Sequence, residues 1–385
     1  MLSYIIKRVF QIVITFFLFL CLSYLLMEAM PGDFGQVFLD DPSLTAEQRE
    51  ALRAGLGLDR PPHERFLIYL GNLATGDMGI SFTYYPQPVS DILLERAPRT
   101  IMLFLTATIV SFYVGFFAGK VLAWRRGGTT EYVTTVGGVM LFTVFTPWFA
   151  LLMMWLFASN QGLDLLPLGK FIRPEVWRDA PVTTNEVFNP MLLTMIIVST
   201  GILSLVVGTR RLVGQQRLLI RSGGSAVLLA GAATYWLTSG IGTYALDIAY
   251  HLILPILTLT LINFAGTMLL TRNSMLETLR EDYIATARAK GLPDNVIRDK
   301  HAARNALLPV VTSFVFSLAF AFSGGIITEN VFSWPGMGAA FLEAAQTQDV
   351  PMVMGTLVFI GLLAMLAHLA ADILYAFLDP RIRYA

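Results

Sequence analysis

The sequence contains little charge and almost no cysteine. Only 14% of its 385 residues are charged, whereas a soluble chain carries about 25%, and its mean hydropathy is +0.63. The single cysteine, Cys21, excludes an internal disulfide. Neither a phosphate-binding loop (GxxxxGK followed by Ser or Thr) nor an HExxH motif occurs, so these signatures of ATP binding and zinc catalysis are missing. We therefore predict no catalytic residue, no cofactor, no metal site and no nucleic-acid partner.

Long apolar runs are abundant. A helix needs about 20 apolar residues to cross a bilayer, and such runs recur along the whole chain. The candidate spans are residues 9–30, 100–123, 133–158, 191–209, 225–245, 252–271, 309–329 and 352–376. They predict an all-α, polytopic membrane protein with about eight transmembrane helices.

The first apolar run follows the sequence MLSYIIKRVF and resembles a secretory signal in its charge pattern. However, it continues to about Met30, beyond the roughly 7–15 residues of a signal core. No small-x-small cleavage site follows it. We predict an uncleaved first membrane helix at residues 1–30.

Positive charge predicts the topology, because Lys and Arg in short loops stay on the cytoplasmic side. The charge clusters are Lys7 with Arg8, Arg125 with Arg126, the Arg-rich connection 210–224, the polar insert 272–308 and the C-terminal stretch LDPRIRY. An alternating eight-helix arrangement places all of them inside. Both termini are therefore predicted to be cytoplasmic.

Residues 31–98 fall outside the membrane in this topology and have the features of a folded extracytoplasmic segment. Thr45–Gln48 (TAEQ) predicts a capping box that begins a short helix ending near Gly55. Pro61 and Pro62 predict the start of a second, amphipathic helix. This segment either covers the mouth of a pore or receives a partner, or it is a packed loop without a ligand.

Acidic residues within the predicted spans are few: Glu28, Glu329 and Asp372. His368 and Asp372 are four residues apart and share one helix face, as the members of a proton relay would. Alternatively, Asp372 lies near the cytoplasmic end of its span and reaches water or a neighbouring helix. So few acidic residues in the spans are a weak basis for transport driven by protons. We therefore expect another protein to supply the energy.

The polar insert predicts two helices with a sharp bend. Residues 274–290 (SMLETLREDYIATARAK) contain good helix formers without Gly or Pro. Gly291 is placed as the C-terminal cap, and Pro293 begins the second helix. Leu308 and Pro309 then mark the return to the membrane. Small residues at 285–289 leave a slim surface for another protein, although the helix pair would also serve merely to brace the bundle.

YIATARAKG followed by HAARNALLP resembles the cytoplasmic coupling loop of ABC-importer permeases, specifically the dipeptide/oligopeptide family. Ala285, Thr286 and Ala287 occupy the Glu-Ala-Ala triplet of that motif, and Gly291 follows at the expected spacing. The acidic first position is missing. Other blocks resemble the family in the same order: MLSYIIKRV, LGLDRPP, GNLATGDMGIS, PRT, ENVFSWPGMG and LDPRIRY.

The resemblance implies a six-helix permease core, and the run 170–248 has no counterpart in it. We expect that run to be an inserted segment carrying an extra transmembrane hairpin. The domains expected are a first membrane helix at 1–30, an extracytoplasmic segment at 31–98, core residues 99–169, the insert 170–248, and core residues 249–385 with the coupling loop 272–308. Whether the hairpin contacts lipid, anionic headgroups or another subunit is open.

The function that the resemblance implies is a pore-forming, non-enzymatic subunit of an ATP-driven importer in a prokaryotic inner membrane. The implied partners are a second, homologous permease subunit in a heterodimer, two cytoplasmic ABC ATPase subunits, an extracytoplasmic substrate-binding protein, and membrane lipid. Di- or oligopeptides are the first substrates implied, with oligosaccharides or nickel as alternatives. A rival of another class is an ion-gradient-driven secondary transporter.

The residues expected to couple to the ATPase lie in and after the first insert helix. Gly291 would serve the bend, the small residues would allow close docking, and Arg288 and Lys290 would make polar contacts. The expected coupling residues are Asp282, Tyr283, Thr286, Ala287, Arg288, Ala289, Lys290, Gly291, Leu308 and Pro309. The sequence names no substrate-binding residue.

Overall fold

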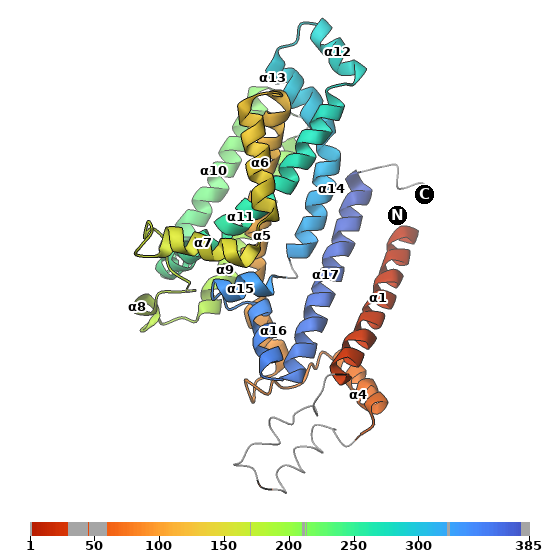
Figure 1. The fold of residues 1–385 in the computed structure, drawn as a ribbon, viewed down its shortest axis with the longest axis vertical. Coiled ribbons are helices and arrows are strands. Elements are labelled where there is room, and N and C mark those ends of the chain that lie inside the picture. Colours follow the sequence, from red (N-terminus) through yellow and green to blue (C-terminus); the bar gives the residue numbers. More distant parts are fainter. Residues whose placement is uncertain are drawn as a thin grey trace. The chain divides into compact units, whose positions relative to one another are not determined.

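The structure is a computed structural model that describes residues 2–29, 45, 60–169, 171–209, 212, 214–321 and 324–378. The chain divides into two compact units, and each is described by itself. The first unit comprises Met1–Leu152, Ile256–Val331 and Pro335–Ala385; the second comprises Met153–Pro255 and Phe332–Trp334. Within the described residues the regular structure is helical (Figure 1), as the sequence predicted. The predicted capping box and short helix at 45–55 lie outside these residues, apart from Thr45.

Six described helices are long and apolar enough to cross a membrane, or seven if one bent pair counts as a span. The six are α1 (Leu2–Glu28), α5 (Val89–Trp124), α9 (Thr184–Gly208), α10 (Gln215–Thr238), α11 (Gly242–Thr278) and α17 (Val350–Leu378). They coincide with six of the predicted spans. The all-α membrane fold is therefore confirmed, while the total of eight helices stays a prediction.

The bent pair corrects the span that was predicted as continuous over 133–158. There the chain forms α6 (Thr129–Thr143) and α7 (Thr146–Ala158), which meet at an angle of 111°. Val144 has an extended backbone at the break. Pro147 follows it and lacks the N–H that a continuous helix would need there. The bend thus has a local cause in the sequence.

A second correction concerns the span predicted at 309–329. The helix found there, α14 (Ala303–Ala321), begins earlier, and the chain then forms a separate short helix, α15 (Ile326–Val331). Gly324 between them has a φ of +71°, a left-handed conformation that ends a right-handed helix and suits glycine. Two elements therefore replace the one expected.

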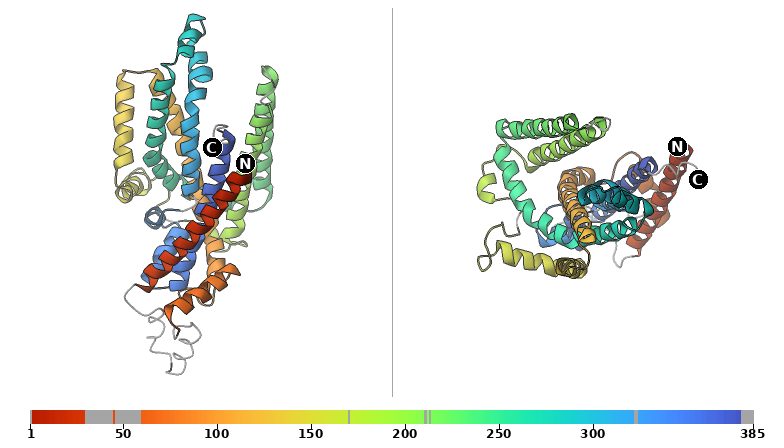
Figure 2. Two further views of the ribbon diagram at one scale, coloured as in Figure 1. Left: turned by 90° about the vertical axis from the view of Figure 1, so that its right-hand side faces the viewer. Right: turned by 90° about the horizontal axis from the view of Figure 1, so that it is seen from above.

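The first unit is a bundle of long helices. In it α14 packs against α17 and α5, and α17 packs against α1 (Figures 1 and 2). Two glycines let α5 approach α11: a Cβ on Gly115 would lie 2.5 Å from the Phe264 carbonyl oxygen, and one on Gly119 would lie 2.4 Å from that of Met268. Small residues at this spacing permit such close helix contacts.

Short helices stand at one end of the first unit. The predicted amphipathic helix is α4 (Pro62–Ala74), with proline at its start as expected. It is held to α1 by the Arg65–Glu28 ion pair at 2.7 Å and by the rings of Tyr24 and Phe66, 4.9 Å apart. The helix α16 (Met337–Gln346) packs on α15, α17 and α5.

The second unit contains the end of α7, the single turn α8 (Pro174–Trp177), the hairpin of α9 and α10, and the beginning of α11. The hairpin helices pack against each other. Arg221 of α10 closes the end of α9, since its Nη2 donates to the Val206 carbonyl (2.6 Å) and its Nε to the Thr209 hydroxyl (2.7 Å). Arg221 thus caps a helix, whereas Arg210 and Arg211 lie outside the described residues. That 170–248 is an insertion stays a prediction.

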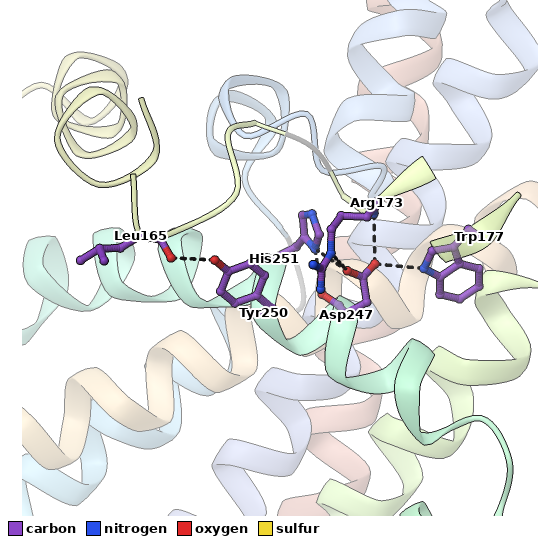
Figure 3. Close-up of polar contacts among 6 residues, drawn as sticks. All are labelled: Leu165, Arg173, Trp177, Asp247, Tyr250 and His251. Carbon is purple, nitrogen blue, oxygen red and sulfur yellow. Dashed lines mark hydrogen bonds and ion pairs between the residues drawn. The ribbon is translucent and has the colours of Figure 1, made fainter. Parts of the chain in front are cut away.

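One carboxylate fastens the loop before α9 to α11 in this unit (Figure 3). Asp247, whose side chain is 1% exposed, accepts hydrogen bonds from the Arg173 backbone N–H (3.0 Å), the Arg173 Nε (2.6 Å) and the Trp177 Nε1 (3.0 Å). Tyr250 donates to the Leu165 carbonyl at 2.6 Å. These bonds fix a loop that is rich in proline and charge and has little regular structure of its own.

We expect Asp247→Ala to lower the thermal stability of the detergent-solubilised protein by several degrees. It removes the buried carboxylate that accepts three hydrogen bonds from Arg173 and Trp177, at a cost of about 1–3 kcal/mol. Asp247→Asn, which keeps one acceptor oxygen, should fall between Asp247→Ala and the wild type. The matched control is Asp179→Ala in the same loop, where the aspartate is exposed. Equal unfolding midpoints for Asp247→Ala and Asp179→Ala would contradict this role.

Candidate functional site

The polar insert 272–308, which was predicted to be a coupling loop, folds as a compact module at one end of the first unit (Figure 1). After α11 ends at Thr278 the chain turns, forms α12 (Asp282–Ala289) and α13 (Asp294–Val296), and passes through the π-helix η2 (Ile297–Ala302) into α14. The continuous helix predicted over 274–290 is therefore wrong. Its residues favour helix individually, but Glu281 has an extended backbone before α12, and Leu279 and Ile284 pack into the same apolar cluster. Tertiary packing overrides local propensity here.

The end of α12 is a Schellman motif, as the placement of Gly291 predicted. The Gly291 N–H donates to the Arg288 carbonyl (2.9 Å), and the Leu292 N–H donates to the Ala287 carbonyl (3.3 Å). Gly291 has a φ of +69°, which costs a residue with a Cβ about 1–2 kcal/mol. Leu292 then packs against the cluster beneath the helix. The second helix begins at Asp294, directly after Pro293, also as predicted.

Beneath α12 lies an apolar cluster that connects it to the bundle. Ile284 and Ala287 are buried against Met275 of α11, Ala303 of α14 and Ala123 of α5. Ala287 was expected among the residues that face a partner. It is 5% exposed and points into the cluster instead, because residues at i and i+3 share one helix face. Its role is to attach α12 to the bundle.

The opposite face of α12 is open. The exposed residues are Asp282, Tyr283, Ala285, Thr286, Arg288, Ala289, Lys290 and Gly291. Ala285, Thr286 and Ala289 give this face small side chains, and Arg288 and Lys290 give it positive charge toward the end of the helix. Tyr283 is held in place by Asn305 of α14, whose Nδ2 donates to its hydroxyl at 2.7 Å. Leu308 and Pro309 are exposed on α14 and do not belong to the cluster under α12.

Ion pairs hold the base of the module. The carboxylate of Asp299 lies 2.8 Å from Arg298 Nε and 3.3 Å from Lys120 Nζ on α5. The hydrogen bond from Arg298, with help from Lys120, lowers the pKa of Asp299 to about 2. Nearby, Arg272 Nε donates to Glu131 at the start of α6 (2.8 Å). The module is thus tied to α5, and α11 to α6, by polar contacts as well as by the apolar cluster.

The three acids noted in the predicted spans have structural partners in the described part of the chain. Glu28 pairs with Arg65, and Asp372 pairs with Arg8 at 3.2 Å. His368 contacts the rings of Phe316 and Phe320. These contacts favour the alternative in which Asp372 serves a neighbouring helix over a proton relay.

Glu329 belongs to a buried network that sequence reasoning missed. Its carboxylate accepts from the Thr100 hydroxyl (2.8 Å) and from the Ala339 N–H (2.9 Å), and the Thr100 hydroxyl accepts from the Met337 N–H (2.8 Å). Glu329 and Thr100 are fully buried. A Cβ on Gly336 would lie 2.5 Å from Glu329 Oε2. The sequence blocks PRT and ENVFSWPGMG contain Thr100 and Glu329, but nothing in either block indicates that the two residues are partners.

Asp349 forms a similar buried centre before α17. It accepts from the Ser81 hydroxyl (2.5 Å), the Thr83 N–H (2.9 Å) and the Met352 N–H (3.1 Å). Ser81, the last residue of the block GNLATGDMGIS, is thus bound to Asp349 directly before α17. Two centres of this kind join segments that are distant in sequence, and both lie in the first unit.

Comparison with known proteins agrees with this arrangement. Residues 111–384 match the family model described as "Binding-protein-dependent transport system inner membrane component", and residues 1–104 match the model for the N-terminal part of such components. The chain belongs to this family. The resemblance drawn from the coupling loop is thereby confirmed, and the chain is a membrane component of a transport system.

Its relatives include transport permeases from several bacteria. The chain is 30% identical over 384 residues to the oligopeptide transport system permease protein AppB of Bacillus subtilis, with 100% of both chains covered. It is 31% identical to the di/tripeptide transport system permease protein DppB of Pseudomonas aeruginosa and to the dipeptide transport system permease protein DppB of Escherichia coli K12. Each of these alignments covers 100% of this chain and 99% of the relative.

We expect Gly336→Ala to reduce the yield of folded protein, because its new Cβ would meet the Glu329 carboxylate inside a packed network. The measurement is the fraction that elutes as a single species after detergent extraction and size-exclusion chromatography. Gly137→Ala on α6 is the control, since a Cβ there meets nothing within 4 Å. Equal folded fractions for the two variants would show that Gly336 is not needed for this packing.

Proposed function

We propose that this chain is a permease subunit of an ATP-driven importer of short peptides, forming half of the translocation pore. The observation that carries the proposal is the exposed face of α12 on a module fixed to the bundle. The relatives named as oligopeptide, di/tripeptide and dipeptide permeases support peptides as the substrate class. Specificity among peptides would be set mainly by a separate binding protein.

The partners proposed are a second, homologous permease, two cytoplasmic ABC ATPases and an extracytoplasmic substrate-binding protein. Two observations support them: the chain lacks a phosphate-binding loop, and its family is named as binding-protein-dependent. In the proposed orientation both termini and α12 are cytoplasmic, and the segment 31–98 is outside. The charge clusters at 125–126, 210–224 and 272–308 support this orientation.

In the proposed mechanism, closure of the ATPases displaces α12 as a rigid body. The Schellman motif fixes its end, the Tyr283–Asn305 hydrogen bond fixes its beginning, and the apolar cluster fixes its inner face. Displacement of α12 is then passed to α11 and α14 and switches access to the pore. Asp282, Arg288 and Lys290 are proposed to contact the ATPase groove.

An ion-driven transporter is the competing function, and it requires ionisable groups in the membrane that are free to change partners. In the described chain Glu28, Glu329 and Asp372 are instead held by structural contacts. The same machinery with nickel or an oligosaccharide as substrate remains the alternative within the class, decided by the binding protein.

Thr286→Trp tests the docking face. We expect the bulky ring to prevent close approach of the ATPase, so that ATPase co-purification and ATP-dependent peptide uptake both fall about tenfold or more, equivalent to a loss of at least about 1.4 kcal/mol of binding. The control is Gln215→Trp, which is also at an exposed position, in the predicted cytoplasmic connection 210–224. Retention of the ATPase by Thr286→Trp at the level of Gln215→Trp would refute the assignment.

Gly291→Val tests the rigid end of α12. A Cβ at position 291 meets no other atom within 4 Å, so the effect of the substitution comes from the backbone. A β-branched residue is unfavourable at the positive φ of this position. We expect normal assembly in the membrane but reduced uptake per ATP hydrolysed. Gly291→Asn, which tolerates this conformation better, should restore most of the coupling. Full uptake by Gly291→Val with normal assembly would rule out the rigid-helix mechanism.

A further inference from the structure

A cavity of about 340 Å³ with a mixed polar and aromatic lining lies within the first unit, between α5, α6, α11 and α14. Its size falls in the range of small-ligand sites, about 300–1,000 Å³. The polar side chains that line it are Thr108, Ser111, Asn263, Thr267, Ser313 and Ser317. Phenylalanine rings form much of the remaining wall, and the lining contains no charged residue. Such a wall offers hydrogen bonds without selecting for charge.

Ser111 on α5 has an unmet hydrogen bond inside this wall. The residue is 4% exposed, and its Oγ has no partner in the described structure. Elsewhere in the lining, the Ser317 Oγ donates to the Ser313 carbonyl of its own helix at 3.0 Å. A buried hydroxyl without a partner costs about 1–3 kcal/mol. That cost is recovered if a molecule in the cavity bonds to Ser111.

Asn263 also lines the cavity and is exposed near the middle of the apolar helix α11. Its Nδ2 donates to the Leu259 carbonyl at 2.9 Å, and no partner for its Oδ1 is found in the described chain. Polar side chains within membrane helices face the bundle interior or water because contact with lipid is unfavourable. The exposed Ser313 and Ser317 of α14 follow the same rule. These residues therefore mark a hydrated face of the bundle.

We propose that this cavity holds the backbone of the transported peptide during passage, with Ser111 and Asn263 hydrogen-bonded to its amide groups. The assignment rests on the proposed function and specifies where the substrate is contacted. A peptide of any sequence presents the same N–H and C=O groups. A neutral wall of hydroxyls and an amide binds these groups without preference for the charge of the side chains. This chemistry suits a pore that takes many peptides.

The test uses the complete transporter in proteoliposomes with its binding protein and tri-alanine as the probe. We expect Ser111→Ala to leave thermal stability unchanged or raise it, because it removes an unpaired buried hydroxyl. Combined with Asn263→Leu, it should lower uptake about tenfold, while ATPase stimulation by the loaded binding protein persists. Ser204→Ala on α9, an exposed hydroxyl outside the cavity, is the control and should transport normally.

A cysteine version tests contact directly. In a Cys21→Ser background, Asn263→Cys should react with a water-soluble maleimide, and tri-alanine delivered by the binding protein should slow that reaction. Three outcomes would each overturn the proposal: unchanged uptake in the double variant, an unreactive cysteine, or loss of the second permease subunit from Asn263→Leu. The last outcome would show that this face is an interface between subunits. If the wild type shows no ATP-driven uptake of peptide, the proposed function fails, and maleimide reactivity still reports whether the face is hydrated.

Discussion

Polar groups inside a membrane bundle must find their hydrogen bonds within the protein, because hydrocarbon supplies none. In this chain that requirement organises the structure. Glu329 is satisfied by Thr100 and the start of α16, and Asp349 by Ser81 and the start of α17. Each acid joins segments that are far apart in sequence. Its hydrogen bonds fix the position of these segments relative to each other, which apolar packing alone would specify less precisely.

Seen this way, the unsatisfied groups are informative. Where Glu329 and Asp349 are surrounded by donors, Ser111 and the Oδ1 of Asn263 have none in the described chain, and both face one cavity. The hydroxyls of Tyr69, Thr135 and Thr260 are also buried without a partner in the described chain, but these residues do not line the cavity. Under the proposed function, Ser111 and Asn263 would make transient hydrogen bonds to a passing peptide, because a transport pathway must bind its cargo and then release it.

Much of this structure is readable from local sequence. The bend after α12 was predictable from the backbone preferences of single residues. Gly291 favours the end of a helix, and Pro293 with Asp294 favours the start of the next one. The break between α11 and α12 was not, because residues 279–281 are ordinary helix formers and the turn arises from packing of Leu279 and Ile284. The inward position of Ala287 has the same origin. The partnership of Thr100 with Glu329 was equally hidden, since it joins residues 229 positions apart.

The coupling module and the cavity share the same helices. The cluster under α12 contains Ala123 of α5, Met275 of α11 and Ala303 of α14, and the cavity is lined by α5, α11 and α14 together with Phe142 of α6. The helix α14 packs against α5, and Gly115 and Gly119 let α5 approach the backbone of α11. In the proposed mechanism, a displacement of α12 would therefore be passed to three helices that line one cavity. A packed interface shifts between discrete arrangements rather than stretching. We therefore expect that movement of α12 would alter the shape of the proposed pathway, although α12 does not line the cavity.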